Sequence, residues 1–172
     1  MRRIPRPLAV ECPAYFGRYT SQVPENDILR VLVEQGADLV ALLAPLGDDG
    51  ALHRYAPGKW SLKEMIGHIT DMERLFVFRC LSFARGAPDE LPGADEDLWV
   101  ENADFDAVPL ADLLAEAAAV RTATVRFFNN LDDTGLARRG RANGMDYRVS
   151  CMPWLIAGHE RHHMNVIRER YL

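Results

Sequence analysis

Four long stretches of the sequence carry apolar residues at helical spacing, and this pattern constrains the fold more than any other feature. They are residues 25–46, 59–86, 108–131 and 153–172, and Pro, Gly, Asp and Asn accumulate between them. Apolar side chains that recur every three to four residues form one face of an amphipathic helix. Four such faces can cover one another in a single core. The sequence therefore predicts an all-α four-helix bundle.

Residues at the ends of these stretches indicate where the helices begin and stop. Pro24 suits an early position of the first helix, and Pro109 does so for the third. Ser61 and Glu64 have the S-x-x-E spacing of a capping box, which predicts the start of the second helix. Gly86 provides the stop of that helix.

The connections between the predicted helices differ in length. Residues 87–108 are rich in Pro, Gly and acidic residues and too long for a tight turn, so we expect a long crossover between helices two and three. Residues 136–150 predict a short hairpin around Asn143-Gly144, before the fourth helix. We expect one bundle domain over residues 1–172, with an irregular segment over residues 1–20.

The charge pattern and the apolar runs argue against several classes of partner. The chain has 25 acidic and 20 basic residues, and its arginines are scattered instead of forming a stripe, so we expect no nucleic-acid ligand. The start of the chain is broken by prolines and lacks the apolar run of a secretory signal. No later run is long enough for a membrane span. We therefore expect a cytoplasmic protein without a membrane partner.

The three cysteines are far apart in the sequence. Cys12, Cys80 and Cys151 include no C-x-x-C pair, which argues against a thiolate metal cluster and against a disulfide framework. We expect all three to be small buried apolar residues.

The fourth predicted helix contains the motif H-E-x-x-H at His159, Glu160 and His163. At 100° per residue, the two histidines point in one direction. The helix's apolar residues cluster around that same direction: Met152, Leu155, Ile156, Val166 and Ile167. Two buried imidazoles one turn apart suit a shared metal ion. Spacing alone leaves open that they hydrogen-bond to neighbours or line a wet groove.

The same motif occurs in zinc proteases, but the residues that follow it do not fit them. The metzincin pattern needs a glycine where this chain has Val166 and a third histidine where it has Glu169. Thermolysin-like enzymes take a glutamate from a later helix, and we expect none before Leu172. A third ligand must then come from upstream.

His68 is the strongest candidate for that ligand, because it lies on the well-capped second helix at the edge of its apolar stripe. His53 precedes the cap in a loop and is expected to be structural or exposed. His162 lies about 100° from His163 around the helix and is expected at the rim of the site. His68, His159 and His163 would form a site of three neutral ligands with open coordination, the catalytic pattern.

From about His53 to the last residue, the chain resembles the DinB/YfiT-like superfamily. The resemblance is carried by "YAPGKWSLKEMIGHITDMERLFVFRCLSFARG", "LPGADEDLWVENA" and "IAGHERHHMNVIRERYL". It implies a four-helix bundle with a long crossover that binds one divalent metal ion, commonly zinc or nickel. The implied ligands are His68, His159 and His163. It also implies a homodimer and a small-molecule substrate, in a family that includes metal-dependent hydrolases and transferases that use low-molecular-weight thiols such as bacillithiol or mycothiol.

Three further side chains are candidates for the chemistry of such a site. Glu160 could reach a water molecule on the metal, or could be a solvated residue on the helix surface. Asp71, one turn after His68, could carry a proton or simply pair with a nearby arginine. Arg79 could guide an anionic thiol cofactor. The alternative to an enzyme is a non-catalytic bundle that binds a metal or a small ligand.

Overall fold

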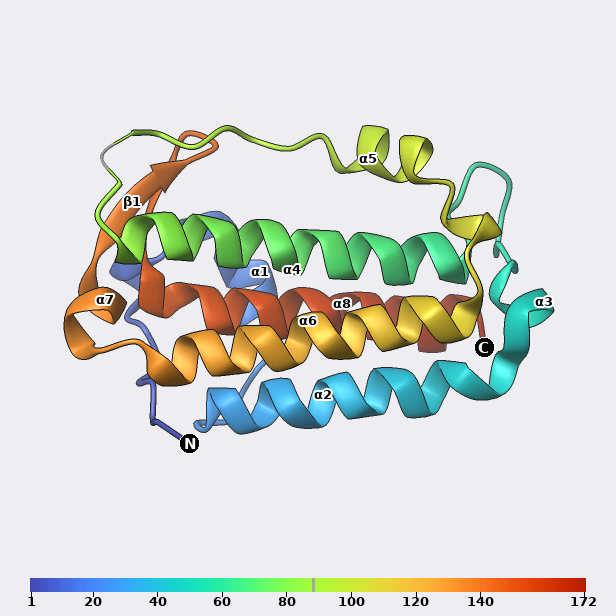
Figure 1. The fold of residues 1–172 in the computed structure, drawn as a ribbon, viewed down its shortest axis with the longest axis horizontal. Helices are drawn as coiled ribbons and strands as arrows, with labels where there is room; N and C mark the ends of the chain where they lie inside the picture. Colours follow the sequence, from blue (N-terminus) through green and yellow to red (C-terminus); the bar gives the residue numbers. More distant parts are fainter. Residues whose placement is uncertain (88) are drawn as a thin grey trace.

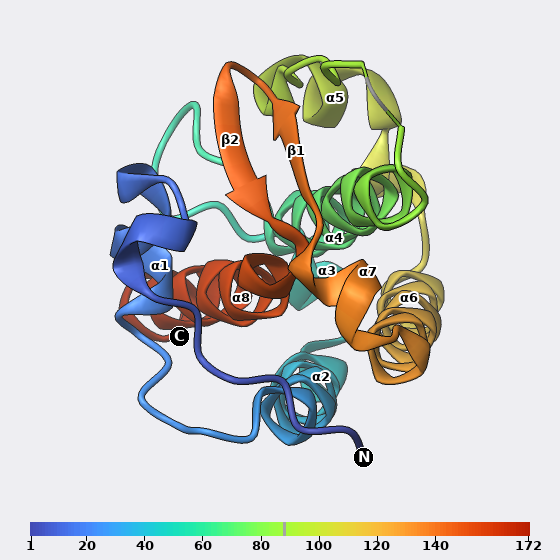
Figure 2. The same ribbon diagram turned by 90° about the vertical axis from the view of Figure 1, so that its left-hand side faces the viewer.

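The computed structural model describes residues 1–87 and 89–172 and contains the expected bundle (Figure 1). Its long helices are α2 (Ile28–Leu43), α4 (Leu62–Ala84), α6 (Leu110–Asn130) and α8 (Met152–Arg170). Seen from one end, they follow the order α4, α6, α2, α8 around the core (Figure 2). None of the helices described is long and apolar enough to cross a membrane.

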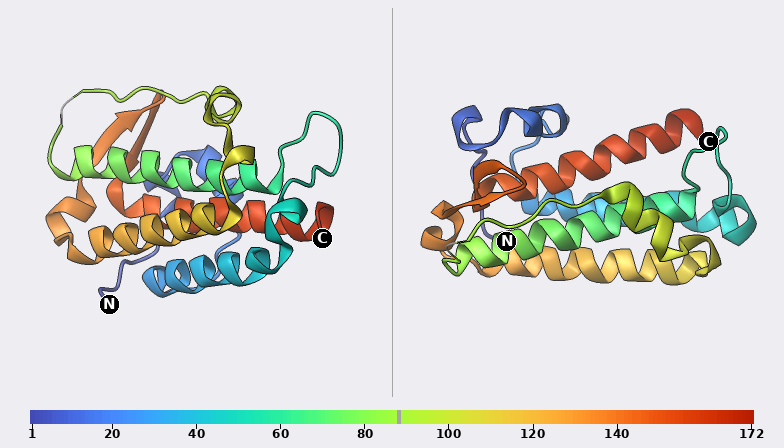
Figure 3. Two further views of the ribbon diagram at one scale, coloured as in Figure 1. Left: turned by 45° about the vertical axis from the view of Figure 1, so that its right-hand side comes forward. Right: turned by 90° about the horizontal axis from the view of Figure 1, so that it is seen from above.

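The crossover predicted between the second and third long helices is present and sets the direction of α6. It carries a helix of its own, α5 (Glu96–Ala103), and returns the chain along α4 to the end where α4 began (Figures 1 and 3). Consequently α4 and α6 are neighbours that run in the same direction, whereas α2 and α6 are antiparallel. The crossover is attached to the hairpin, since the Leu91 amide donates to the Arg141 carbonyl at 3.0 Å.

The hairpin before α8 has the predicted turn. Strands β1 (Arg139–Ala142) and β2 (Met145–Arg148) are antiparallel, with Gly140 opposite Tyr147. Asn143 and Gly144 join the strands with φ values of 52° and 71°. A two-residue turn with both residues at positive φ matches the twist of a hairpin, which explains the Asn-Gly pair.

The predicted helix boundaries are confirmed at α4 and shifted at α2. The Glu64 amide donates to the Ser61 hydroxyl at 3.0 Å, and the Ser61 amide donates to the Glu64 carboxylate at 2.7 Å, which completes the capping box. Helix α2 begins at Ile28 instead of about Pro24, because Asp27 accepts a hydrogen bond from the Arg30 amide and caps it.

Short helices and turns fill the segments between the long helices. The sequence did not predict them, because each is too short to show an apolar period. They are α1 (Gly17–Thr20), α3 (Gly47–Ala51) and α7 (Asp133–Ala137), with 3-10 turns at Ala9–Glu11, Ala14–Phe16, Ala44–Leu46, Phe105–Ala107 and Val149–Cys151.

The expectation that all three cysteines are small apolar residues is wrong for two of them. Cys12 and Cys151 form a disulfide bond, with their Cα atoms 5.9 Å apart, while Cys80 is free and buried. The two bonded cysteines are separated by 139 positions, so no local spacing announces the bond. The disulfide attaches the N-terminal segment to the start of α8.

Gly158 allows this N-terminal segment to lie directly on α8 (Figure 2). A Cβ atom added at Gly158 would lie 2.3 Å from the carbonyl oxygen of Tyr19, which belongs to α1. Glycine in a helix is less stable than alanine by about 1 kcal/mol, so the close contact accounts for its presence.

We expect Gly158→Ala to destabilise the protein by about 1–3 kcal/mol, although alanine is the better helix former. The backbone of Tyr19 would have to move away from α8. The measurement is the free energy of unfolding in denaturant. The control is Gly17→Ala, since a Cβ atom at Gly17 meets nothing within 4 Å. A stabilising effect of Gly158→Ala equal to that of the control would show that the two segments do not touch.

Candidate metal centre

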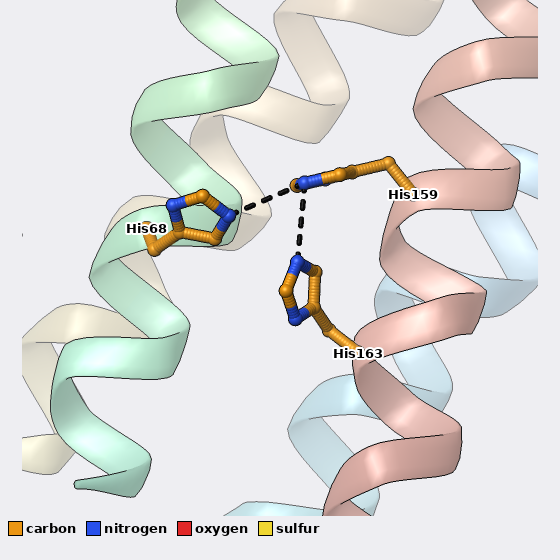
Figure 4. A group of neighbouring side chains, drawn as sticks. All are labelled: His68, His159 and His163. Carbon is orange, nitrogen blue, oxygen red and sulfur yellow. Dashed lines mark hydrogen bonds between the residues drawn. The ribbon is translucent and has the colours of Figure 1, made fainter. Parts of the chain in front are cut away.

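Three of the five histidines converge between α4 and α8 (Figure 4). The Nε2 atom of His159 lies 3.2 Å from that of His68 and 3.1 Å from that of His163. Nitrogen ligands at 2.0–2.1 Å from a tetrahedral zinc ion are about 3.3 Å apart. The Nε2 atoms of His68 and His163 each lie at about that separation from the Nε2 atom of His159, and one nitrogen from each of the three rings lies within 4.8 Å of the others. No other set of metal-binding side chains converges in the part of the chain that the structure describes.

Burial keeps the three imidazoles in the form that binds metal. It lowers the pKa of His68 to about 4. Burial, with His68 and His162 as neighbours, lowers the pKa of His159 to about 3. The pKa of His163 is also well below its ordinary value, for the same main reason. All three rings are thus neutral at pH 7, with a nitrogen lone pair free for a cation.

These lowered pKa values should make the stability of the metal-free protein depend on pH. The unfolded chain protonates His68 near its ordinary pKa of 6.5, whereas the folded chain does so near 4. Between these values the unfolded state binds more protons, so the free energy of unfolding should fall as the pH falls from 6.5 towards 4. Thermal unfolding of chelated protein across this range measures the effect. His68→Gln should weaken the dependence, and an unchanged slope in that variant would contradict the assignment.

The histidines open into a cavity of about 480 Å³. Such a volume is typical of sites for small molecules. The cavity wall comes from five parts of the chain, which are the N-terminal segment, α4 with the residues just before it, the crossover, the hairpin and α8. Its aromatic residues are Tyr15, Phe16, Tyr19, Trp60, Phe76 and Tyr147. A larger cavity of about 810 Å³ lies between α2 and α6, but it contains none of the three histidines. The smaller cavity is therefore the candidate site for a substrate, because the three histidines line it.

Aromatic rings hold the ligand histidines from the sides. The Trp60 ring lies 4.7 Å from the His68 ring, measured between centroids. Tyr19 and Phe76 approach His159 edge to face, at 5.6 and 5.8 Å. The sequence did not predict the contribution of Tyr19, because residues 1–20 carry no periodic pattern that would place them. These contacts restrict the orientation of the imidazoles and shield them from water.

Glu160 does not lie on the helix surface, as one of its two sequence interpretations required. It is 1% exposed, and its carboxylate lies 2.8 Å from Arg121 and 3.2 Å from the amide nitrogen of Gln35. Arg121 also pairs with Glu73 at 2.8 Å and donates to the Leu32 carbonyl at 2.7 Å. Burial raises the pKa of Glu160, and Arg121 opposes the rise. Glu160 is not among the residues that line the histidine cavity.

The buried network of Glu73, Arg121 and Glu160 was not predicted from the sequence, although one signal for it was present. Arg121 lies on the apolar stripe of its helix, with Leu114 and Phe128 one heptad away on either side. A charge on a core-facing stripe predicts a buried partner. Its partners lie on two other helices, so the sequence alone could not identify them.

The remaining candidate residues lie at different distances from the cavity. Asp71 pairs with Arg74 at 3.0 Å, as its alternative interpretation proposed, and does not line the cavity. Arg79 lines the cavity and is 6% exposed. His162 is half-buried against Tyr19, next to the ligands. His53 is exposed in a loop, as expected, and lies near the Tyr171 ring.

Helix α8 continues through Glu169 to Arg170. The chain therefore makes no turn after the motif like that of the metzincins, and Glu169 is exposed. Glu169 therefore lies away from the histidine pair, and the third histidine beside that pair, His68, belongs to α4.

Comparison with known proteins agrees with the fold. No curated protein matches the chain. A solved structure, YfiT from Bacillus subtilis, is described as a probable metal-dependent hydrolase with an unusual four-helix bundle topology. It superimposes with a TM-score of 0.72 and 20% identity, over 83% of this chain and 82% of YfiT. The model of the DinB superfamily matches residues 32–167, which include all three histidines. This chain belongs to the DinB superfamily.

Proposed function

We propose that the protein is a metal-dependent enzyme that acts on a small molecule, either by hydrolysis or by transfer to a low-molecular-weight thiol. The observation that carries this proposal is the convergence of His68, His159 and His163 at the wall of a cavity. The description of YfiT as a probable metal-dependent hydrolase supports the first reaction. Three protein ligands would leave coordination positions open for a substrate, as in catalytic and not in structural zinc sites.

A divalent ion held by three neutral imidazoles would supply Lewis acidity, which lowers the pKa of a bound water or thiol. The chain's own residues prepare the place for this chemistry. Trp60, Tyr19 and Phe76 surround the ligands and limit the access of water. Low local polarity strengthens electrostatic interactions within the cavity. Asp71 pairs with Arg74 on its own helix, and Glu160 pairs with Arg121 of α6. We therefore do not assign proton transfer to either carboxylate, and we propose that Glu160 helps to hold α8 against α6.

The finer parts of the proposal rest on the family resemblance. They are zinc or nickel as the ion, a thiol such as bacillithiol or mycothiol as cosubstrate, and a homodimer. A further part, a cytoplasmic location, rests instead on the pattern of apolar residues and prolines in the sequence. The Cys12–Cys151 disulfide bears on this location, because cytosolic disulfides in most organisms are transient or redox-sensing. The redox state of these two cysteines should therefore be determined in cell extracts prepared with a thiol-blocking reagent.

The proposed function is tested by reconstituting chelated, untagged protein with zinc or nickel and screening two reaction sets. One set contains activated esters and amides, and the other contains electrophiles with low-molecular-weight thiols. We expect turnover only in metal-loaded protein and in one of the two sets. His53→Gln, which removes an exposed histidine, is the control and should keep full turnover. A fully loaded protein without turnover in either set would favour the alternative, a bundle that binds metal without catalysis.

A further inference from the structure

Arg79 is a buried cation in the histidine cavity without a carboxylate partner among the residues that the structure describes. Its side chain is 6% exposed. One terminal nitrogen donates to the Pro92 carbonyl at 2.7 Å, and the Nε atom has no hydrogen-bond partner. A buried guanidinium that lacks a counter-charge destabilises the folded chain. Such a residue is expected where a bound ligand supplies the missing acceptor.

Tyr147 presents a second unpaired polar atom in the same cavity. It is 1% exposed, and its hydroxyl donates to no acceptor, although the Arg79 guanidinium lies close enough to donate to the hydroxyl oxygen. The ring is fixed between Phe16 and Phe83, each 5.3 Å away between centroids. Burial raises the pKa of Tyr147, and the neighbouring Arg79 opposes the rise, so the hydroxyl is protonated and able to donate. Two donors therefore meet in one place and carry a single positive charge.

The cavity joins these donors to the metal centre. Arg79 follows His68 by eleven residues on α4, which is about 16 Å along a helix axis. The arginine side chain leans back towards the start of the helix, which shortens this span. The wall between the two ends is apolar and includes Met72, Leu75 and Phe76. Glu96 and Asp97 also line the cavity, but both are exposed on α5, where solvent screens their charge.

We propose that Arg79 and Tyr147 form an anion subsite at the end of the cavity away from the metal centre, and that the ligand is an elongated apolar molecule with a terminal carboxylate. One positive charge and two donors match the charge and the two oxygens of a carboxylate, whereas a phosphate dianion would remain half neutralised. The subsite stands on the two unpaired donors alone. The placement of the ligand's other end at the histidines rests on the proposed function.

The test compares the binding of 5-phenylpentanoate and 5-phenylpentanamide, which differ in charge and scarcely in shape. Isothermal titration calorimetry on metal-loaded protein should show the carboxylate binding at least about tenfold tighter than the amide. The ratio should fall to about one in Arg79→Met, and it should fall in part in Arg79→Lys and Tyr147→Phe. It should persist in His163→Ala. The thermal midpoint of ligand-free Arg79→Met should be unchanged or higher, because a buried unpaired charge has been removed.

Two results would overturn the subsite. A preference that survives Arg79→Met and disappears in His163→Ala would mean that the carboxylate binds the metal. A lower thermal midpoint in Arg79→Met with an unchanged preference would make Arg79 a clamp for the Pro92 carbonyl only. Should Arg79→Met not fold, Arg79→Lys and Tyr147→Phe decide the question. Because binding needs no turnover, an Arg79-dependent preference in a protein that proves inactive would overturn the proposed enzyme and leave the subsite in place.

Discussion

Replacement of His68, His159 or His163 by alanine is expected to reduce the metal content of the purified protein from about one ion per chain to near zero. The three side chains are the whole ligand set that the described structure offers. Loss of a residue that merely orients a ligand already weakens metal binding by about 10–100-fold. Loss of a ligand itself should therefore weaken it by more than about 100-fold. Elemental analysis of untagged protein measures this, since an affinity tag binds metal itself.

Two histidines outside the cluster provide matched controls for this measurement. His53→Ala and His162→Ala remove an imidazole without removing a ligand, so both should retain the metal. The helical signal in circular dichroism should survive chelation, because an apolar core fills the bundle and the ion joins only α4 and α8. A wild-type protein that stays empty after incubation with zinc and nickel would contradict the metal centre. A collapse of the helices on chelation would instead make the metal structural.

The convergence of the three histidines could be predicted from the sequence because helical periodicity fixes the directions of side chains. The spacing of His159 and His163 places both rings on one face, and the apolar residues around them show that this face is buried. The stripe beside His68 carries the same information for the second helix. Within a helix, the geometry is regular enough for numbering alone to bring the side chains together.

The cavity around the centre could not be predicted, because contacts between distant segments form it. Tyr19 contacts His159 from the N-terminal segment, which the Cys12–Cys151 disulfide attaches to the start of α8 and which packs closely on α8 at Gly158. Tyr147 reaches Arg79 through a hairpin whose turn was predictable but whose packing against α4 was not. Periodicity describes one element at a time, so it contains no information on such contacts.

Replacement of Arg121 by methionine is expected to lower the free energy of unfolding by about 3–5 kcal/mol, the typical effect of removing one partner of a buried ion pair. Arg121 is 6% exposed and holds the carboxylates of Glu73 and Glu160, which are 4% and 1% exposed. Without the guanidinium, two buried carboxylates would face each other with no counter-charge. Equilibrium unfolding in urea measures the loss.

A second set of variants distinguishes the effect of unpaired charge on stability from the effect of lost packing in this network. Arg121→Met combined with Glu73→Leu and Glu160→Leu should recover most of the lost stability, because an apolar replacement of a complete buried network is often neutral or stabilising. Arg30→Met, at an exposed pair with Glu34, removes an arginine from the surface and should change little. If Arg121→Met alone were as mild as Arg30→Met, the buried network would not exist in solution. If the triple variant stayed as unstable as Arg121→Met, the loss would come from the hydrogen bond to the Leu32 carbonyl and from packing, not from unpaired carboxylates.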